Sequence, residues 1–415
     1  MTVVKREDLR QVVSEVVEST PVVDIHTHLY SPDFGDLLLW GFDELVTYHY
    51  LIAETMRIES MPYEQYWTMG KQEQADLIWQ RLFLDNSPYS EAARGVLTTL
   101  HKLGLDVSSR DVASYREYFA NLTVEEYVDK VFEVGNISKA IMTNDPFDDA
   151  ERRVWLEKGG CTDERFLAAL RLDPLLIDWP NACRRLAEWG YKVEVGLTEP
   201  TVAEVQRFLK DWIGRMKPVY MAVSLPYTFR YPEDSDMAKV IERCVLPVSR
   251  ETNVPFALMI GVKRSANPGL QVAGDAVGKS DITAVEYLCR NYPDNKFMVT
   301  MLSRENQHEL AVAARKFRNL MVFGCWWFLN NPSLVEEITR MRFELLGSSV
   351  IPQHSDARVL DQLIYKWAHS RQIIAKVLAD KYEDLADTGW LVTREEIERD
   401  VAKLLGGNLW TFLEG

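Results

Sequence analysis

Val22-Val23-Asp24-Ile25-His26-Thr27-His28 is an apolar, β-branched run that ends in two histidines one residue apart. Such a run predicts a buried strand, because Val and Ile are enriched in strands. Side chains alternate between the two faces of a strand, so His26 and His28 project to the same side and can offer two imidazole nitrogens to one ion. The alternative is a buried histidine beside a surface histidine. The stretch therefore raises a metal-site hypothesis that depends on the rest of the chain.

Short apolar runs like this one recur along the chain, each followed by a polar cluster and then by a segment with helical spacing. The eight runs are 22–25, 140–143, 166–172, 219–225, 255–262, 297–302, 320–325 and 349–352. Strands that alternate with helices pair in parallel. Eight such units in 415 residues predict a single domain, residues 1–415, built as a closed (β/α)8 barrel of the TIM type. No Gly-rich dinucleotide loop or phosphate-binding loop follows any of these runs.

Residues 31–135 differ in character from the other parts of the chain. They are rich in Trp and Tyr and contain few β-branched runs, which predicts a helical insertion after the first strand. Within it, Thr123 and Glu126 have the spacing of a capping box, which marks the start of a helix. A helical pattern at 5–19 predicts that another helix precedes the first strand.

The charge balance limits the partners that this chain can have. Against 47 Lys and Arg stand 62 Asp and Glu, a net charge of −15, which argues against nucleic-acid binding and against a polybasic membrane anchor. Five widely spaced cysteines without a Cys-x-x-Cys pair, and an N-terminus that becomes charged early, predict a reduced, cytoplasmic protein. We therefore expect a small molecule as the partner, with no nucleic acid and no membrane.

The carboxyl ends of barrel strands form the face that carries active sites, so the polar residues that follow the runs are the first candidates. Asp356 follows the eighth run, which neighbours the first run in a closed barrel, and can therefore reach His26 and His28. Two imidazoles and one carboxylate make an open site for Zn²⁺ or a similar divalent ion. The alternative role for Asp356 is an N-cap of a helix beginning near Ala357.

Three arginines follow the third, sixth and eighth runs, namely Arg171, Arg304 and Arg358. Guanidinium groups that converge on one mouth suit a carboxylate, because their planar fork binds it bidentately. We interpret them as substrate-binding residues. For each of them the alternative is a structural ion pair, for which Asp173 and Glu305 are close in sequence.

Aromatic residues and a further histidine add candidates for substrate contact and proton transfer. His49 lies between two tyrosines in a segment, 43–52, whose spacing predicts one helix that presents His49 and Tyr50 to the barrel mouth. Trp326 and Trp327 end the seventh run and are expected to point opposite ways, with Trp326 lining the pocket. The alternative for all of them is packing on the barrel.

Five of these segments together resemble the amidohydrolase superfamily and, over essentially the whole chain, its uronate isomerase family. The segments are 26–28, 44–50, 170–174, 303–308 and 354–358. Amidohydrolases commonly add a carboxylated Lys or a Glu on the fourth strand and histidines on the fifth and sixth. Here the fourth run ends without such a residue and the fifth contains no His. Since ligands that bridge two metals are missing, one metal is expected.

The resemblance implies an aldose–ketose isomerase that interconverts D-glucuronate with D-fructuronate, and D-galacturonate with D-tagaturonate, through an enediol. It implies one divalent metal, zinc, held by His26, His28 and Asp356. It also implies catalytic roles for Asp356, Tyr50, His49 and Arg358, a sugar acid held by Arg171, Arg304 and Arg358, and a homo-oligomer. Two alternatives stay open: a mononuclear metal-dependent hydrolase of an amide or lactone, and a non-catalytic sugar-acid-binding protein.

Overall fold

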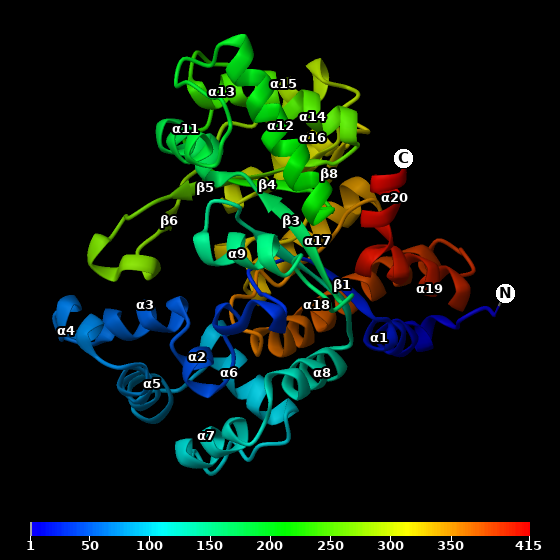
Figure 1. Ribbon diagram of the computed structural model, residues 1–415. Coiled ribbons are helices and arrows are strands. Elements are labelled where there is room, and N and C mark those ends of the chain that lie inside the picture. Colours follow the sequence, from blue (N-terminus) through cyan, green and yellow to red (C-terminus); the bar gives the residue numbers. More distant parts are fainter. Residues whose placement is uncertain (1) are drawn as a thin grey trace.

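A parallel sheet lies at the centre of the computed structural model, which describes residues 2–415 (Figure 1). Its strands are β1 (Val22–Thr27), β2 (Ile137–Asn144), β3 (Phe166–Arg171), β4 (Met221–Pro226), β5 (Phe256–Lys263), β7 (Phe297–Met301) and β8 (Leu320–Val322). Each of them pairs in parallel with the next one along the chain. Seven of the eight predicted runs therefore form strands of one parallel sheet.

Two details of the strand prediction are wrong. The eighth run, 349–352, forms only an isolated bridge, between Ile351 and Phe323. Pro352 has no amide hydrogen to donate to a sheet, and the backbone becomes left-handed at Asp356, where φ is +53°. In addition, a two-residue strand that no sequence pattern predicted, β6 (Ala276–Val277), pairs antiparallel with β5.

The sheet is curled and has a core on its inner face. Successive strands contribute inward-pointing side chains to this core, which includes Ile25, Ile141, Ala169, Ala222, Ala257, Met259, Met298, Met321 and Ile351. The outer face packs in a second, larger core. β5 shows the alternation, because Ala257 and Met259 belong to the inner core whereas Phe256, Leu258 and Ile260 belong to the outer one.

Two main-chain hydrogen bonds join the segment that follows the eighth run to β1. The amide of Asp356 donates to the carbonyl oxygen of His26 (3.1 Å), and the amide of His28 donates to the carbonyl oxygen of Ala357 (2.7 Å). These bonds place Asp356 beside two histidines that are distant in sequence.

Helices alternate with the strands and surround the sheet (Figure 1). From β2 to the eighth run they are α9 (Asp149–Glu157), α10 (Asp173–Ile177), α11 (Trp179–Glu188), α12 (Glu199–Met216), α13 (Asp236–Val240), α14 (Leu246–Thr252), α15 (Thr283–Asn291), α16 (Gln307–Ala314) and α17 (Pro332–Leu346). α1 (Leu9–Ser19) precedes β1, and α18 (Gln362–Asp387), α19 (Arg394–Ala402) and α20 (Asn408–Glu414) follow the last run. None of the helices found in residues 2–415 is long and apolar enough to cross a membrane.

Helices and loops also fill the chain between β1 and β2. The helices are α2 (Phe42–Val46), α3 (His49–Ile58), α4 (Tyr63–Thr68), α5 (Lys71–Trp79), α6 (Glu91–Lys102), α7 (Val112–Ala120) and α8 (Val124–Gly135). The predicted capping box is confirmed at the start of α8, where Oγ1 of Thr123 accepts from the amide of Glu126 and the Glu126 carboxylate accepts from the amide of Thr123. The prediction of one helix over 43–52 is wrong, because the backbone is extended at Tyr48 and separates α2 from α3.

Candidate active site

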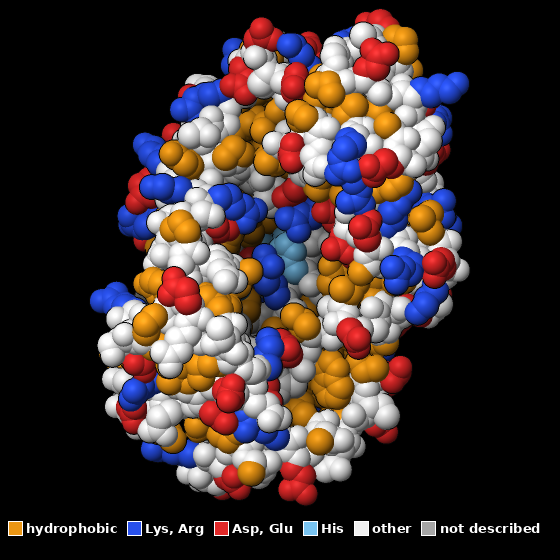
Figure 2. Space-filling view, turned by 60° about the vertical axis from the view of Figure 1, so that its left-hand side comes forward, with side chains coloured by type: hydrophobic (Ala, Val, Ile, Leu, Met, Phe, Trp, Pro, Cys, Tyr) orange, Lys and Arg blue, Asp and Glu red, His pale blue; other side chains and the backbone are white. Residues whose placement is uncertain are grey.

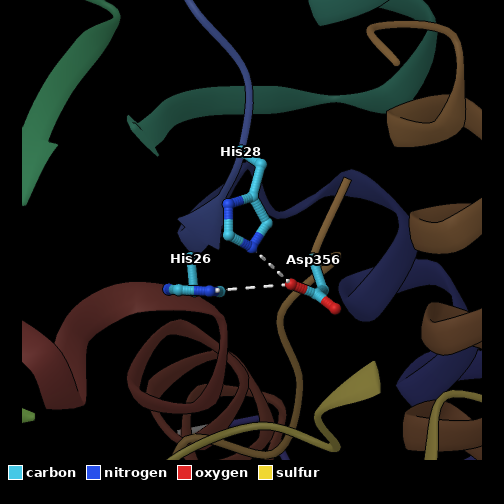
Figure 3. Close-up of side chains that lie close together, drawn as sticks. All are labelled: His26, His28 and Asp356. Carbon is cyan, nitrogen blue, oxygen red and sulfur yellow. Dashed lines mark ion pairs between the residues drawn. The ribbon is translucent and has the colours of Figure 1, made fainter. Parts of the chain in front are cut away.

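His26, His28 and Asp356 converge at the carboxyl end of β1. Nε2 of His28 lies 3.3 Å from Oδ1 of Asp356, and Nε2 of His26 lies 3.6 Å from the same oxygen (Figure 3). One ligand atom from each of the three residues lies within 4.8 Å of the others. The alternative role for Asp356, a helix N-cap, is wrong because the next helix begins only at Gln362.

The chemistry of this cluster fits a divalent cation. Nε2 of His26 and Oδ1 of Asp356 are buried and have no hydrogen-bond partner within residues 2–415. Leaving a buried polar atom unpaired costs about 1–3 kcal/mol, so a bound cation would stabilise both. Burial lowers the pKa of His26 to about 3 and that of His28 well below its usual value. Both rings are therefore neutral at pH 7, which is the form that binds metals.

Buried polar groups hold the turn that carries Asp356. The amide of Ser355 donates to Oδ1 of Asp24 (3.0 Å), whose Oδ2 accepts from Nε1 of Trp367 (2.8 Å). Nζ of Lys366 donates to the carbonyl oxygen of Ser355 (2.6 Å). Asp24 and Lys366 are both buried, and no sequence pattern had pointed to either of them as part of the site.

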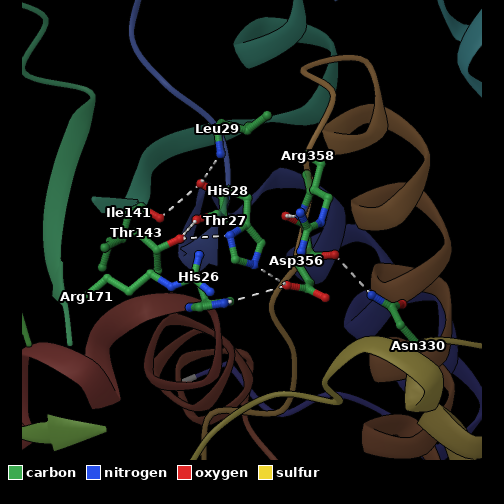
Figure 4. Close-up of polar contacts among 12 residues, drawn as sticks. His26, Thr27, His28, Leu29, Ile141, Thr143, Arg171, Asn330, Asp356 and Arg358 are labelled. Atoms are coloured by element: carbon green, nitrogen blue, oxygen red, sulfur yellow. Dashed lines mark hydrogen bonds and ion pairs between the residues drawn. The ribbon is translucent and has the colours of Figure 1, made fainter. Parts of the chain in front are cut away.

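Two of the three predicted arginines lie next to the cluster. Figure 4 shows Arg171 on one side of the histidines and Arg358 on the other. After burial, the charges of these two guanidinium groups are the largest influences that lower the pKa of His28. Arg171 also forms an ion pair with Asp173 (2.9 Å), so the pair considered from the sequence does occur. The two cations flank a site that a carboxylate can enter.

Arg304 and Trp326, which the sequence also predicted to bind substrate, contact other residues. The side chain of Arg304 is 54% exposed and pairs with Glu337 of α17 (2.9 Å). Trp326 is buried with its ring centroid 5.9 Å from that of Trp327, and both belong to the inner core of the sheet. The expectation that one of these two tryptophans packs outward is therefore wrong.

The segment Tyr48-His49-Tyr50 brings proton-transfer groups to the cluster. The ring centroids of His49 and Tyr50 are 4.7 Å apart, and Nε2 of His49 and the Tyr50 hydroxyl are buried without a hydrogen-bond partner in the described chain. Burial, followed by the charge of Arg358, lowers the pKa of His49 to about 3, and burial raises the pKa of Tyr50 well above its usual value. The negative charge of the Asp356 carboxylate raises both pKa values, so it opposes the effect of burial on His49 and adds to it on Tyr50. At neutral pH the His49 ring is thus neutral and the Tyr50 hydroxyl keeps its hydrogen.

The site is open to solvent on one side. Of the three side chains in the cluster, that of His28 is 16% exposed, whereas those of His26 and Asp356 are 2% and 6% exposed. Figure 2 shows a hollow in one face of the molecule in which a histidine side chain is visible, with Lys and Arg side chains at its edge. Within the cluster, the His28 side chain is therefore the one that solvent reaches most.

Solved structures of known proteins share this arrangement of the chain. The crystal structure of a uronate isomerase from Bacillus halodurans C-125 aligns with this chain over 100% of this chain's length and 98% of the isomerase's length. The sequence identity is 59% and the TM-score is 0.98. The chain belongs to the uronate isomerase family. It is therefore an enzyme of a family of isomerases, and a hydrolase is not favoured.

More distant members of the uronate isomerase family share the fold. A uronate isomerase from Thermotoga maritima covers 98% of this chain and 99% of its own, and a glucuronate isomerase from Caulobacter crescentus covers 99% and 94%. Both have a TM-score of 0.76 and 15% sequence identity. No protein-family model and no curated protein sequence matches the chain.

Proposed function

We propose that this enzyme interconverts D-glucuronate with D-fructuronate and D-galacturonate with D-tagaturonate. The observation that carries the proposal is the 59% identity, over the whole chain, with the uronate isomerase from Bacillus halodurans C-125. The site supplies the groups that this chemistry needs, which are proton acceptors and donors, cations for the sugar carboxylate, and a cluster fit for one metal. A homo-oligomeric state and a cytoplasmic location are part of the same proposal.

We further propose that residues 1–415 form one closed (β/α)8 barrel domain in which 349–352, bridged to Phe323 through Ile351, takes the position of the eighth strand, and 31–135 is a helical insertion. Support comes from the main-chain bonds that join Asp356 and Ala357 to β1, and from Ile351, which lies in the inner core with the side chains of the parallel strands. In such a barrel the proposed site residues lie at the carboxyl ends of strands or in the segments that follow them, with His49 and Tyr50 at the start of α3.

His26, His28 and Asp356 would hold one divalent ion, for which we propose zinc, because two imidazoles and one carboxylate with open positions are typical of catalytic zinc. When bound, the ion would polarise the substrate oxygens at the reacting carbons. The roles that follow belong to the side chains of this chain alone.

Isomerisation of an aldose to a ketose moves a proton from C2 to C1 through an enediol, so C2 is oxidised and C1 reduced within one molecule. We assign the proton transfers to Asp356, His49 and Tyr50. The Asp356 carboxylate and the neutral His49 ring can accept protons, and the Tyr50 hydroxyl can donate one to a substrate oxygen. The Arg358 guanidinium stabilises the negative charge that develops on the enediol oxygens.

The substrate carboxylate needs cationic partners in this site. We propose that Arg171, Arg304 and Arg358 bind the carboxylate and hydroxyl groups of the sugar acid, and that Trp326 lines the pocket. Arg171 and Arg358 lie on either side of the histidines already (Figure 4). Arg304 must leave its exposed partner Glu337 to take part.

The test is a coupled isomerase assay on glucuronate and galacturonate, with metal content measured on the same sample. Asp356→Asn should lower turnover by roughly 10²- to 10⁴-fold and Arg358→Met by roughly 10²- to 10³-fold, with the protein still folded by circular dichroism. The surface variants Asp387→Asn and Arg6→Met, from an exposed ion pair, are matched controls that should leave turnover unchanged. Near-normal turnover in Asp356→Asn or Arg358→Met would remove that residue from the mechanism, and acid release from a lactone without isomerisation would indicate a hydrolase.

A further inference from the structure

We propose that the hydroxyl groups of Thr143 and Tyr220 fix both histidines of the cluster in the one tautomer that leaves Nε2 free to bind a cation. Thr143 is the seventh residue of β2, and Tyr220 directly precedes β4. The inference deepens the proposed metal centre and rests on it. Thr143 and Tyr220 would act as positioning residues, since they touch the histidines and not the cation.

Thr143 determines the hydrogen position on His28. Its Oγ1 lies 2.8 Å from the carbonyl oxygen of Thr27 and 3.1 Å from Nδ1 of His28 (Figure 4). A hydroxyl group has one hydrogen, and a carbonyl oxygen can only accept, so the hydrogen of Thr143 points to Thr27. A lone pair of Oγ1 then faces Nδ1, which must carry the hydrogen of the neutral ring.

Tyr220 does the same for His26. Its hydroxyl oxygen lies 2.7 Å from the carbonyl oxygen of Ile25 and 3.0 Å from Nδ1 of His26. The hydroxyl hydrogen is directed to Ile25, so Nδ1 of His26 again has to donate. The side chain of Tyr220 is fully buried.

A hydroxyl group from β2 and one from the residue before β4 thus make the same pair of contacts. Each is bonded to a carbonyl oxygen of β1 and to the histidine that follows that carbonyl group. Both Nε2 atoms are left with a lone pair, directed at Oδ1 of Asp356 from 3.3 and 3.6 Å (Figure 3). A neutral imidazole binds a metal only through the nitrogen that lacks hydrogen, and its other nitrogen usually donates to a fixed partner. In the opposite tautomer, Nε2–H would donate to Asp356 and close the site.

The two hydroxyl groups can be removed with little change of shape. Tyr220→Phe and Thr143→Val delete the hydroxyl, and Thr143→Ser keeps it. Tyr231→Phe is a control for the loss of a buried tyrosine hydroxyl elsewhere, because the hydroxyl of Tyr231 contacts only that of Tyr292 (3.1 Å) among the hydrogen bonds found. Circular dichroism and thermal unfolding show whether each variant folds. If Tyr220→Phe does not fold, the comparison of Thr143→Val with Thr143→Ser still tests the inference.

Two readouts are needed, the tautomer of the metal-free protein and the affinity for Zn²⁺. Long-range ¹H–¹⁵N correlation spectra of protein labelled with ¹⁵N-histidine should show Nδ1 protonated on His26 and His28. Tyr220→Phe should shift the tautomer equilibrium of His26 toward the form with hydrogen on Nε2. Thr143→Val should shift that of His28 in the same direction. In a competition titration against a chelating dye, each of these two variants should bind Zn²⁺ roughly 10- to 100-fold more weakly than the wild type. Thr143→Ser and Tyr231→Phe should keep the wild-type affinity.

The outcomes separate this inference from the metal centre on which it rests. Protonated Nε2 in the wild type, or unchanged tautomers in Tyr220→Phe and Thr143→Val, would overturn it. Shifted tautomers with unchanged Zn²⁺ affinity would overturn the role in metal binding. If the wild type binds no Zn²⁺, the proposed metal centre fails, and the spectra of the metal-free protein still decide whether the hydroxyl groups fix the rings.

Discussion

Nζ of Lys366 lies 2.6 Å from the main-chain oxygen of Ser355, so a buried ammonium group is bonded directly to the turn that carries Asp356. Burial lowers the pKa of Lys366 to about 8, and the negative charge of Asp356 acts in the opposite direction. The side chain is therefore still mostly charged at pH 7. Its position gives Lys366 two effects on the site: it holds the left-handed turn in place and it supplies positive charge near the Asp356 carboxylate.

Lys366→Met should lower kcat/KM by roughly 10- to 100-fold, because a small displacement of a catalytic group is enough for such a loss. Stability should not fall, since methionine removes a costly buried charge and the Ser355 carbonyl still accepts from Nδ2 of Asn330 (3.1 Å). Thermal unfolding and steady-state kinetics measure the two effects. Lys376→Met is the matched control, because Lys376 is an exposed residue of the same helix that pairs with Glu336. Wild-type activity in folded Lys366→Met would contradict the positioning role.

Gly324→Ala should destabilise the enzyme more than Gly347→Ala. Both glycines have a positive φ, +65° and +60°, but a Cβ at Gly324 would lie 1.8 Å from Cδ2 of His354, whereas nothing lies within 4 Å at Gly347. The difference in the free energy of unfolding isolates the clash, for which we expect about 1–3 kcal/mol. Turnover should also fall only in Gly324→Ala, because the His354 ring packs against that of His26 with centroids 5.1 Å apart. Urea unfolding of both variants is the measurement, and equal losses would exclude the clash.

Glu151 should make stability depend on pH. Its buried carboxylate accepts from the Tyr30 hydroxyl (2.7 Å), from Nδ2 of Asn144 (3.1 Å) and from the amide of Asp145 (2.9 Å). Burial raises its pKa from 4.5 to about 7, against the effect of these hydrogen bonds. Because the folded state holds the proton more tightly than the unfolded state, the contribution to stability is complete below pH 4.5 and is lost as pH rises through 7.

Glu151→Gln removes this titration and keeps a side chain that can bond to the same groups. From pH 4.5 to above pH 7, the wild type should therefore lose about 3 kcal/mol of unfolding free energy relative to Glu151→Gln. Unfolding by urea across this range gives the difference directly. Glu157→Gln, at the exposed end of the same helix α9, should run parallel to the wild type. A difference between wild type and Glu151→Gln that does not change with pH would refute the elevated pKa.

The fold could be predicted wherever the signal is local. The stretch from Val22 to His28 specifies its strand through β-branched residues and a period of two, and Thr123 with Glu126 specifies the start of α8 through contacts three residues apart. The break at Tyr48 could not be predicted, because the spacing around it is helical. In the folded chain the Tyr48 ring contacts that of Tyr50 and lies under Nζ of Lys366, a residue that is distant in sequence. The four residues from Ser349 to Pro352 are too few for an alternation pattern to distinguish a paired strand from the isolated bridge that they form.

The candidate site likewise contains residues that the sequence indicates and residues that only the folded chain reveals. Asp24 lies two residues before His26 on the same face of β1, so alternation could have pointed to it, but its partners Ser355 and Trp367 are visible only in the folded chain. Lys366 lies within the long helix α18, and no local pattern indicates which of its residues reaches the turn before Asp356. Most of the proposed substrate and metal groups lie at or after strand ends, where the sequence indicates them; Asp24 and Lys366 are recognised only through hydrogen bonds to residues that other parts of the chain supply.

Arg304 tests how the sugar acid is held. Its ion pair with Glu337 is exposed at both ends, with side chains 54% and 50% accessible, and exposed pairs of this kind stabilise a protein little, so the guanidinium can leave it for a substrate carboxylate. Arg304→Met should raise KM by roughly 10- to 100-fold, since a hydrogen bond to a charged group is worth about 1.5–3 kcal/mol. Glu337→Gln, which frees the guanidinium, should leave KM equal or lower. Arg340→Met is the matched control, because Arg340 pairs with Glu336 and Asp380 on the helices α17 and α18 and should not affect KM. An unchanged KM in Arg304→Met would leave the ion pair with Glu337 as the role of this arginine.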